Sequence, residues 1–505
     1  MIAKIHSIVP HGFEGKLVEV EGDMNKGLPA FNIVGMANKT INEAKERVRS
    51  AIVNSGFSFP NKKVTISLAP AELQKDGAYL DLPIALSVLV LSRQLLSSDT
   101  SKKLFVGELA LDGKVRPVRG VINIIEAALK AGYTEIYVPI DNLSQASLVS
   151  GARVYGVDTL KNLFLALKDQ VDLKTPECLC KSAEVRKEKQ NILTIDQVRG
   201  QDLAKRAIEV AIAGHHNILI SGPPGAGKTL LAKAAANLLP DLASEEMIEI
   251  TKVYSMAGLS TDEIIRERPF RSPHHTASQI SLIGGKDGPG EISLAHKGIL
   301  FLDEIPEFPR SVLEALRQPL EDKVISVSRA GAKVTYPADF MLIATMNPCP
   351  CGYLGDPAHE CKCSEVQIQN YRKKLSGPLF DRIDMYIEVE KVKNSELRLK
   401  QSEGTPKNNV VKNTITEAIC RQKHRYGKGG VFNSSLSSFE VSQKLRMTPD
   451  AEKLLTSASE RLSLSARSFF KTIKVAQTIA DLDDSDIIEL KHLTEALSYR
   501  KRENF

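Results

Sequence analysis

The spacing of hydrophobic positions changes twice along the 505-residue chain. Residues 1–171 combine strand-like alternation, at 15–21, 31–34 and 63–68, with helical spacing at 41–55 and 81–93. From 192 to 392, short apolar runs alternate with helical segments, which indicates a parallel sheet with helices on both faces. From about residue 408 the pattern is almost wholly helical, and Thr448-Pro449 has the N-cap and first residue typical of a helix start.

These patterns predict an α/β protein with several domains. We expect an N-terminal α+β domain over 1–171, a linker over 172–191, an αβα domain with a parallel sheet over 192–392 and a helical domain over 393–505. The linker is inferred because residues 172–190 are charged and poor in aromatic side chains. The hydrophobic content of 42% suits a protein with proper cores. The net charge of +6 is compatible with a nucleic-acid partner but too small to indicate one.

Targeting and redox signals are few. The chain begins without the apolar core of a signal peptide, and its most apolar helical stretch, 82–96, is short and contains Arg93. We therefore expect no membrane segment. Seven cysteines in a long chain of this kind indicate a reducing cytoplasm.

The glycine-rich segment 222–229 carries the strongest chemical signal. It follows an apolar strand pattern and precedes a helical run, which is the context of a phosphate-binding loop. In such loops backbone N–H groups surround a polyphosphate, and the start of the following helix favours the anion. Lys228 is expected to reach the β- and γ-phosphates and Thr229 to hold Mg²⁺. The predicted nucleotide-binding residues are Gly222, Pro223, Pro224, Gly225, Ala226, Gly227, Lys228 and Thr229.

Two further strand patterns end in residues that suit nucleotide hydrolysis. Asp303 and Glu304 follow the apolar run 298–302. We expect Asp303 to complete the Mg²⁺ shell and Glu304 to polarise the attacking water as a general base. The run 341–345 leads to Asn347, whose amide is expected to orient that water. The alternative for the carboxylates is a solvated acidic strand end, which Lys228 and Thr229 disfavour.

This constellation resembles the AAA+ ATPases. The segment 198–201, with Gln201, resembles the one that borders the adenine pocket, and Asn347 matches the sensor 1 position. Arg382, within 380–384, is similar to an arginine finger, and Arg467 fits sensor 2 on the helical lid. An arginine finger acts on a neighbour's nucleotide, so the resemblance implies a homo-oligomeric ring, a hexamer, that uses ATP and Mg²⁺. The alternative for each arginine is a surface or ion-paired role.

Residues 324–336 alternate around an Ala-Gly turn, which predicts a β-hairpin. The hairpin is similar to the pre-sensor-1 hairpin of minichromosome-maintenance helicases and magnesium chelatases, and the segment 268–290 resembles the helix-2 insertion of the same clade. Arg329 and Lys333 would then face a ring channel and contact a DNA backbone electrostatically. The alternative, solvated charges at a hairpin tip, carries equal weight. His274 and His275 lack metal-ligand partners at useful spacing, so a structural role is expected.

Two close cysteine pairs follow Asn347. Four thiolates in this arrangement suit structural Zn²⁺, with no open position for catalysis. Both pairs are C-x-C rather than the commoner C-x₂-C, so free thiols or a redox pair remain alternatives. The candidate zinc ligands are Cys349, Cys351, Cys361 and Cys363.

The N-terminal segments 68–86 and 106–120 resemble the active-site region of Lon-type proteases. Tyr79 stands where Lon has its serine, and Ile122 stands where Lon has its lysine. Neither residue can form a Ser–Lys dyad, because nucleophile and base are both missing. The resemblance therefore implies a Lon-like fold and argues against proteolysis.

Together these segments resemble the ComM/YifB family of magnesium chelatase-like bacterial proteins over essentially the whole chain. The family implies a hexameric ATP-driven motor, whose competence-related members act in branch migration of recombining DNA during natural transformation. We therefore expect an ATPase that works as a translocase or helicase on single-stranded or branched DNA. The main alternative is a protein-remodelling AAA+ ATPase without DNA activity. A chelatase motor subunit and an ATP-dependent protease are disfavoured.

Overall fold

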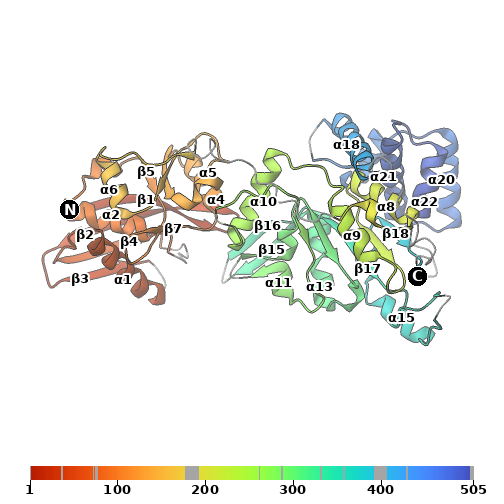
Figure 1. Cartoon of the computed structure of the whole chain (residues 1–505), viewed down its shortest axis with the longest axis horizontal. Coiled ribbons are helices and arrows are strands. Elements are labelled where there is room, and N and C mark those ends of the chain that lie inside the picture. The colour runs from red at the N-terminus through yellow and green to blue at the C-terminus, as the bar shows by residue number, and fades with distance from the viewer. Residues whose placement is uncertain are drawn as a thin grey trace.

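The computed structural model describes residues 2–35, 38–71, 73, 78–176, 193–260, 262–285, 288–329, 332–356, 359–391, 407–427 and 430–500. Figure 1 shows an elongated molecule, in which the N-terminal region, the second sheet and the C-terminal helices follow one another along the long axis. The predicted linker from residue 177 onward, with Cys178 and Cys180, lies outside the described residues.

A seven-stranded mixed sheet forms the N-terminal region. Alternate side chains of a strand point to opposite faces, so Ile5 of β1 joins the core beneath α1, α2 and α6, whereas Ile8 joins the core beneath α4. The strands and helices predicted here are confirmed. In sheet order the strands are β3 (Ala30–Val34), β4 (Lys63–Ala69), β2 (Glu14–Asn25), β1 (Ile2–His11), β5 (Lys103–Phe105), β8 (Glu135–Pro139) and β9 (Arg153–Val157), and the main helices are α1 (Asn38–Asn54), α2 (Asp81–Leu91), α4 (Val121–Lys130) and α6 (Leu160–Leu167).

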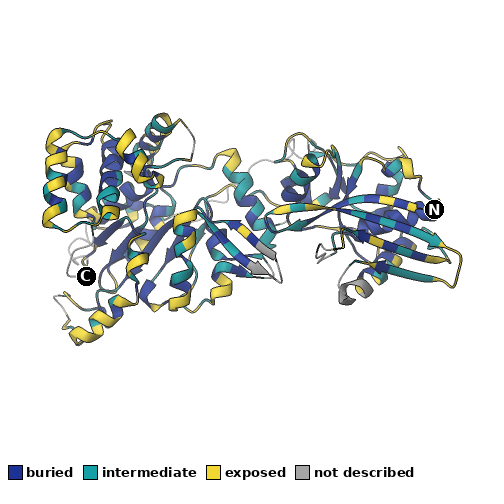
Figure 2. Cartoon of the chain, turned by 180° about the vertical axis from the view of Figure 1, so that it is seen from behind, coloured by how far each residue is buried: buried dark blue, intermediate teal, exposed yellow. Residues whose placement is uncertain are grey.

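A five-stranded parallel sheet forms the centre of the molecule, which confirms the predicted architecture. Ile218 and Ile220 of β10 face the core shared with the C-terminal helices, whereas Leu219 faces the opposite core. Figure 2 shows these buried strands between helices whose outer faces are exposed. The sheet order is β11 (Phe270–Arg271), β14 (Ile299–Leu302), β17 (Met341–Met346), β10 (Ile218–Ser221) and β18 (Met385–Glu388), and the principal helices are α8 (Asp202–Gly214), α9 (Lys228–Ala236), α10 (Ser244–Ala257), α13 (Arg310–Ala315), α14 (Arg317–Asp322) and α15 (Glu365–Lys373).

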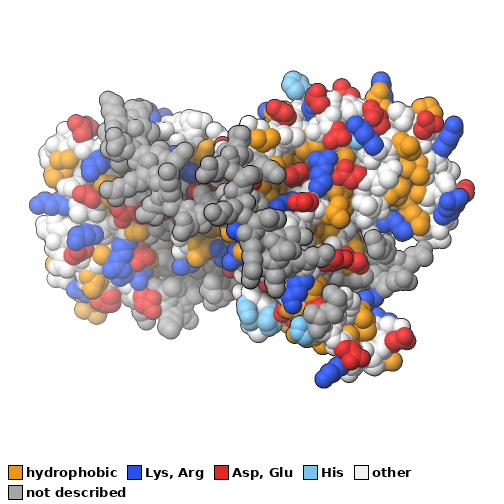
Figure 3. Space-filling view, turned by 45° about the vertical axis from the view of Figure 1, so that its right-hand side comes forward, with side chains coloured by type: hydrophobic (Ala, Val, Ile, Leu, Met, Phe, Trp, Pro, Cys, Tyr) orange, Lys and Arg blue, Asp and Glu red, His pale blue; other side chains and the backbone are white. Residues whose placement is uncertain are grey.

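The described C-terminal residues are helical, as predicted, and they pack on α8 through a common core. Thr448 caps its helix as expected: its side chain accepts a hydrogen bond from the backbone N–H of Ala451, and Pro449 is the first helical residue. Figure 3 shows positive and negative side chains intermixed over this end of the molecule rather than one basic face. The helices are α18 (Lys407–Tyr426), α19 (Ser438–Lys444), α20 (Pro449–Arg461), α21 (Ala466–Leu482) and α22 (Leu490–Ser498).

The N-terminal region docks on α10 of the central region. The backbone N–H of Gly120 donates to Ser255 Oγ (2.9 Å), and Lys252 Nζ pairs with Glu126 (2.5 Å). Gln145 donates to two backbone carbonyls of the segment that follows α10. These bonds hold the two regions together at the junction visible in Figure 1.

Among the described residues, no helix combines the length and the apolar content that crossing a bilayer requires.

Candidate functional site

The residues predicted to bind and hydrolyse a nucleotide gather at one edge of the central sheet. Gly222 follows β10, Asp303 follows β14 and Asn347 lies just beyond β17. Because these strands are parallel, their carboxyl ends meet at the same edge, which is where open α/β sheets bind ligands.

The phosphate-binding loop has the backbone that its glycines permit. Gly225 (φ 79°) and Gly227 (φ 83°) are left-handed, a conformation that other residues adopt at a cost. A Cβ at Gly222 would lie 2.4 Å from the carbonyl oxygen of Val389, so the loop and the end of β18 approach too closely for a side chain. The loop then opens directly into α9 at Lys228, so the helix N-terminus faces the loop.

The Lys228 ammonium lies inside this loop. Its Nζ donates to the carbonyl oxygen of Gly222 and to Asn347 Oδ1 (3.0 Å). Burial lowers the pKa of Lys228, and the negative charges of Asp303 and Glu304 oppose that shift. The loop therefore holds a cation beside the sheet edge where the two carboxylates also lie.

Hydrogen bonds connect Asp303, the carboxylate predicted to hold Mg²⁺, to the phosphate-binding loop and to β17. Thr229 Oγ1 donates to Asp303 Oδ2 (3.1 Å), and Thr345 Oγ1 donates to Asp303 Oδ1. The backbone N–H of Glu304 donates to Thr345 Oγ1 (3.0 Å). Thr345 was outside the predicted set. Strand pairing reveals it, because Leu302 pairs with Ala344 and the next residues of both strands are then neighbours.

Glu304 and Asn347 are in direct contact. Asn347 Nδ2 donates to Glu304 Oε1 (3.2 Å), so this amide links the carboxylate to Lys228. Glu304 also has a left-handed backbone (φ 53°), which is uncommon for a non-glycine residue and concentrates at functional sites. The geometry is thus compatible with a general base and an amide that orient one water molecule.

Gln201, predicted to border the adenine pocket, lies between the phosphate-binding loop and the segment after β18. Its Nε2 donates to the carbonyl oxygen of Ala226 (3.2 Å) and to that of Glu390 (2.5 Å). Gln201 precedes α8 with a left-handed backbone (φ 61°). It ties the phosphate-binding loop to the segment after β18.

The two predicted arginines lie at the other edge of the sheet. Arg382 and Asp384 precede β18, and Asn217, which contacts Asp384, precedes β10. Strand β10 has four residues and spans about 13 Å at about 3.3 Å per residue. Arg382 therefore lies away from the phosphate-binding loop of its own chain.

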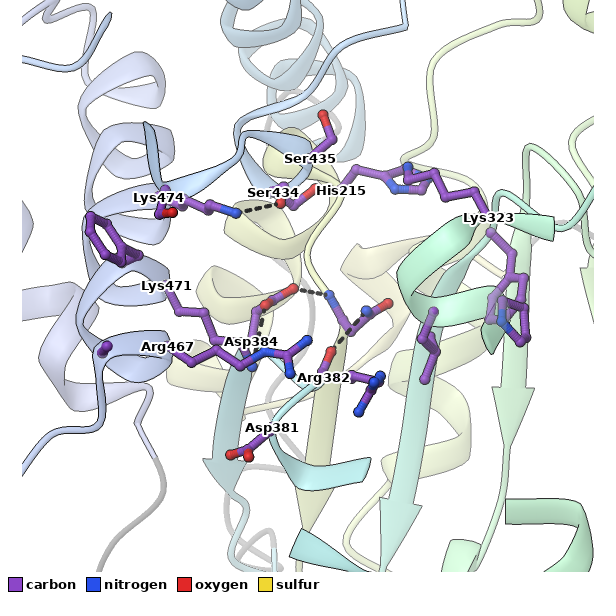
Figure 4. A pocket seen from close by; sticks show the side chains of 17 residues that line it. His215, Lys323, Asp381, Arg382, Asp384, Ser434, Ser435, Arg467, Lys471 and Lys474 are labelled. Carbon is purple, nitrogen blue, oxygen red and sulfur yellow. Dashed lines mark hydrogen bonds and ion pairs between the residues drawn. The ribbon is translucent and has the colours of Figure 1, made fainter. Parts of the chain in front are cut away.

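A basic cavity of about 400 Å³ occupies this amino edge, between the sheet and α21. Arg467, Lys471 and Lys474 reach it from α21, while Lys323 and Arg382 reach it from the central region (Figure 4). Lys471 Nζ donates to the carbonyl oxygen of Ile383 (2.7 Å) and lies 3.7 Å from Asp384. The structure thus brings Arg382 and Arg467 to one site.

The predicted hairpin is confirmed as the antiparallel pair β15 (Val324–Arg329) and β16 (Ala332–Pro337). In its register Arg329 pairs with Ala332 and Ser328 pairs with Lys333, which places both basic residues at the turn end. The side chains of Arg329 and Lys333 lie outside the described part of the structure. At the base, Asp339 pairs with Lys323 and with Lys297 (2.9 Å).

The insertion before β14 contains a second, very short pair, β12 (Gly284–Gly285) and β13 (Gly288–Pro289). Arg271 forms a bidentate pair with Glu291 (2.7 Å each), and Arg268 pairs with Glu246 (2.7 Å). Both arginines therefore stabilise the fold locally. His274 Nδ1 contacts Thr276 Oγ1 (2.8 Å), and no metal-ligand cluster among the described residues includes it.

The four cysteines predicted as ligands converge. Their ligand atoms all lie within 4.8 Å of one another, and three of the Sγ–Sγ distances are 3.3, 3.6 and 3.6 Å. Four sulfurs at about 2.3 Å from a tetrahedral ion would be about 3.8 Å apart, so the set fits a metal such as Zn²⁺. A disulfide needs about 2.05 Å, and all four are free thiols. Backbone hydrogen bonding from Tyr353 lowers the pKa of Cys351 to about 6.

The cysteine loop lies against the phosphate-binding loop. A Cβ at Gly352 would come within 2.7 Å of the Pro224 ring, and Gly352 has a left-handed backbone (φ 83°). The candidate metal site thus packs directly against the phosphate-binding loop, at Pro224. Sequence spacing alone indicated the four ligands but not this contact.

The N-terminal positions that correspond to the Lon dyad hold no catalytic pair. Tyr79 is largely buried, which raises the pKa of its hydroxyl, and Ile122 is fully buried. Asp81 is buried against Arg47 (2.7 Å), and burial raises the pKa of this carboxyl to about 6. The Lon-like character of this region remains a prediction.

A phosphate-binding loop at the carboxyl edge of a parallel sheet, followed by a hairpin insertion and a helical lid, defines an AAA+ fold of the magnesium-chelatase type. Comparison with known families agrees. Residues 194–397 match the family described as magnesium chelatase, subunit ChlI, residues 20–142 match subunit ChlI of Mg-chelatase, and residues 406–500 match the C-terminal part of subunit ChlI.

Full-length relatives narrow the class. The chain is 41% identical to the protein YifB of Escherichia coli (strain K12), over 98% of this chain and 96% of that protein. It is also 41% identical to the competence protein ComM of Haemophilus influenzae, over 99% of this chain and 97% of that protein. The similarity to the magnesium-chelatase 67 kDa subunit of Chlorobaculum parvum is 25% over 31% of this chain. The protein belongs to the ComM/YifB family of magnesium chelatase-like AAA+ proteins.

Proposed function

We propose that this protein is an ATP-hydrolysing ring motor that moves along DNA and promotes branch migration during recombination or natural transformation. The observation that carries the ATPase part is the convergence of Lys228, Asp303, Glu304 and Asn347 at one sheet edge. Phosphoryl transfer needs this kind of arrangement, because its catalysis rests on positioning and charge neutralisation.

Each residue has a distinct task in this proposal. The loop amides and Lys228 hold the phosphates of ATP, and Thr229 and Asp303 hold Mg²⁺, which neutralises phosphate charge when bound. Glu304 accepts the proton of the attacking water, whose orientation Asn347 fixes. Gln201 closes the nucleotide site on the side of α8.

The ring follows from the two arginines. Arg382 and Arg467 lie at the amino edge, about 13 Å along β10 from the phosphate-binding loop of the same chain. A neighbouring copy that presents its own loop to this edge would supply the γ-phosphate that both arginines stabilise. We propose a hexamer with six shared sites. ATP, DNA and reduced thiols are all available in the bacterial cytoplasm, where we expect it to act.

The DNA part of the proposal rests on the hairpin and on a relative. The hairpin places Arg329 and Lys333 at its turn end, where a ring channel would lie, and one full-length relative is named a competence protein. Protein remodelling without DNA is the second candidate. Arg268 and Arg271 do not support DNA binding, because both are already paired with carboxylates.

The test of this function is ATP turnover with different DNA forms. We expect branched and single-stranded DNA to raise the rate of ATP hydrolysis, and we expect the protein to move a labelled three-strand junction only with ATP. An unfolded protein serves as the competing activator. Stimulation by the unfolded protein, with none by any DNA, would favour the remodelling candidate.

Arg329→Ala combined with Lys333→Ala is expected to weaken DNA binding. Loss of two phosphate contacts should lower the slope of log K against log salt concentration by about 2, because each contact releases about one counterion. Fluorescence anisotropy over a salt series measures this. Arg446→Ala with Lys453→Ala on the lid removes two exposed charges as a control. An unchanged slope in the hairpin variant would count against a channel role.

We propose that the cysteine cluster holds a structural Zn²⁺. Reduced protein should contain about one zinc per chain by elemental analysis, and Cys351→Ser with Cys361→Ser should lose it. Because Gly352 braces Pro224, loss of the metal should also weaken ATP binding and lower the melting temperature. Cys420→Ser is the control, since Cys420 is exposed and apart from the cluster. Full activity without any bound metal would refute this role.

A further inference from the structure

One carboxylate holds both arginines of the amino edge. Glu321 is near the end of α14, and its Oε2 accepts a hydrogen bond from Arg382 Nη2 while its Oε1 accepts one from Arg467 Nη2 (3.4 Å). Arg382 precedes β18, whereas Arg467 belongs to the lid helix α21. Glu321 therefore connects two cations that come from different parts of the chain. Glu321 was outside the predicted set of site residues.

Glu321 supplies negative charge at a site where several cations gather, alongside Asp381 and Asp384 of the cavity lining. Lys471 and Lys474 line the same cavity as Arg382 and Arg467 (Figure 4), and like charges this close repel one another. The charge of Arg467 contributes to lowering the pKa of Lys471, after the larger effect of burial. Hydrogen bonds from Arg382 and charges of both arginines lower the pKa of Glu321 itself, so it is ionised at neutral pH.

Apart from Glu321, few contacts fix the two guanidinium groups. Arg382 Nη1 donates to the carbonyl oxygen of Pro378 (2.7 Å), but its Nε is buried without a hydrogen-bond partner. The Arg467 side chain is 44% exposed. Side chains as long as these have many rotamers, and fixing both on one bidentate anion selects a single arrangement.

The same short segment reaches the hairpin. Two residues after Glu321, the side chain of Lys323 pairs with Asp339, which lies just beyond β16. The backbone carbonyl oxygen of Lys323 accepts a hydrogen bond from the backbone N–H of Ala338 (2.8 Å). Strand β15 begins at the next residue. Glu321 and the base of β15 and β16 are therefore joined by one short segment of chain.

We propose that Glu321 is a positioning residue that holds Arg382 and Arg467 in place for a neighbouring subunit's nucleotide. This inference rests on the proposed sharing of the ATP site. In this role Glu321 acts through the two arginines. It orders the two guanidinium groups before the γ-phosphate arrives and competes with that phosphate for their N–H groups.

The first test is kinetic. Glu321→Ala is expected to lower kcat for ATP by about 10²-fold, the cost of misplacing groups by about 1 Å, with ATP affinity changed less than about twofold. Glu321→Asp should restore part of kcat, since the anion is kept. Asp322→Asn is the matched control, an exposed acid next in the chain. An unchanged or raised kcat in Glu321→Ala would overturn the assignment.

The second test separates positioning from folding damage. Glu304→Gln subunits keep their arginines but lack the base, so mixing them with Glu321→Ala subunits should place intact arginines beside intact ATP sites. We expect the mixed ring to hydrolyse ATP at least 10-fold faster than either variant alone. A parallel mixture of Glu304→Gln with Arg382→Ala tests the shared site itself. Recovery with Arg382→Ala but not with Glu321→Ala overturns only the role of Glu321. Recovery with neither overturns the shared site and this inference with it.

Discussion

Glu304→Gln should bind ATP with normal affinity and hydrolyse it about 10²- to 10⁴-fold more slowly. Glutamine keeps the shape of the side chain and the oxygen that accepts from Asn347 Nδ2, so the site should remain assembled. It lacks the basicity that a carboxylate offers to the attacking water. Single-turnover hydrolysis and equilibrium binding of a fluorescent ATP analogue measure the two effects separately.

Two further variants serve as controls, one for loss of nucleotide binding and one for an unrelated charge change. Lys228→Ala should lose nucleotide binding itself, because its ammonium is the cation held inside the phosphate-binding loop. Glu307→Gln, three residues after Glu304 and exposed, should behave as the unmodified protein. If Glu304→Gln turns over ATP at the normal rate, another group is the base and the assignment of this edge must be revised.

Arg382→Ala is expected to reduce ATP turnover in the assembled ring by about 10³-fold or more, the range in which arginine fingers act. Nucleotide binding should be nearly intact, because the arginine lies at the edge opposite its own phosphate-binding loop. Arg467→Ala should act in the same direction, since both arginines share Glu321. Steady-state kinetics at protein concentrations above the assembly threshold measure the loss.

The control for these arginines is Arg461→Ala, an exposed position at the end of α20. Melting temperature and sedimentation should show that each variant folds and assembles. Because the Arg382 side chain is mostly buried and bonded to a backbone carbonyl, Arg382→Lys is a useful second change that keeps charge without the bidentate geometry. Normal turnover by an assembled Arg382→Ala ring would rule out the finger.

Much of the architecture could be predicted from local sequence. Short continuous apolar runs at β10, β14 and β17 indicated buried strands, and the residues that follow them belong to one edge whenever the strands are parallel. Contacts between distant segments could not be predicted. Thr345 becomes visible only through the pairing of β14 with β17, and the packing of Gly352 on Pro224 depends on how a loop folds back.

Glu321 illustrates the limit most clearly. An acid near the end of a short helix has no signature in a single sequence, and most such acids are solvated. Its role depends on three segments that meet in space: α14, the approach to β18 and the lid helix α21. The ionic partners of Arg268 and Arg271 could likewise not be predicted, because charge type alone does not distinguish a DNA contact from an internal pair.

The docking of the N-terminal region on α10 has a mechanical consequence. At the turn between β1 and β2, a Cβ on Gly12 would lie 2.6 Å from Val334 Cγ1, so this turn is wedged against β16 as well. With both attachments in place, the seven-stranded sheet is fixed to the central region at two points, on α10 and on β16. A rotation of the hairpin that carried the sheet with it would displace β3, at the far end in Figure 1, more than the residues at the junction, because displacement grows with distance from the axis of rotation. Any side chain at position 12 would clash with Val334 and weaken this second attachment.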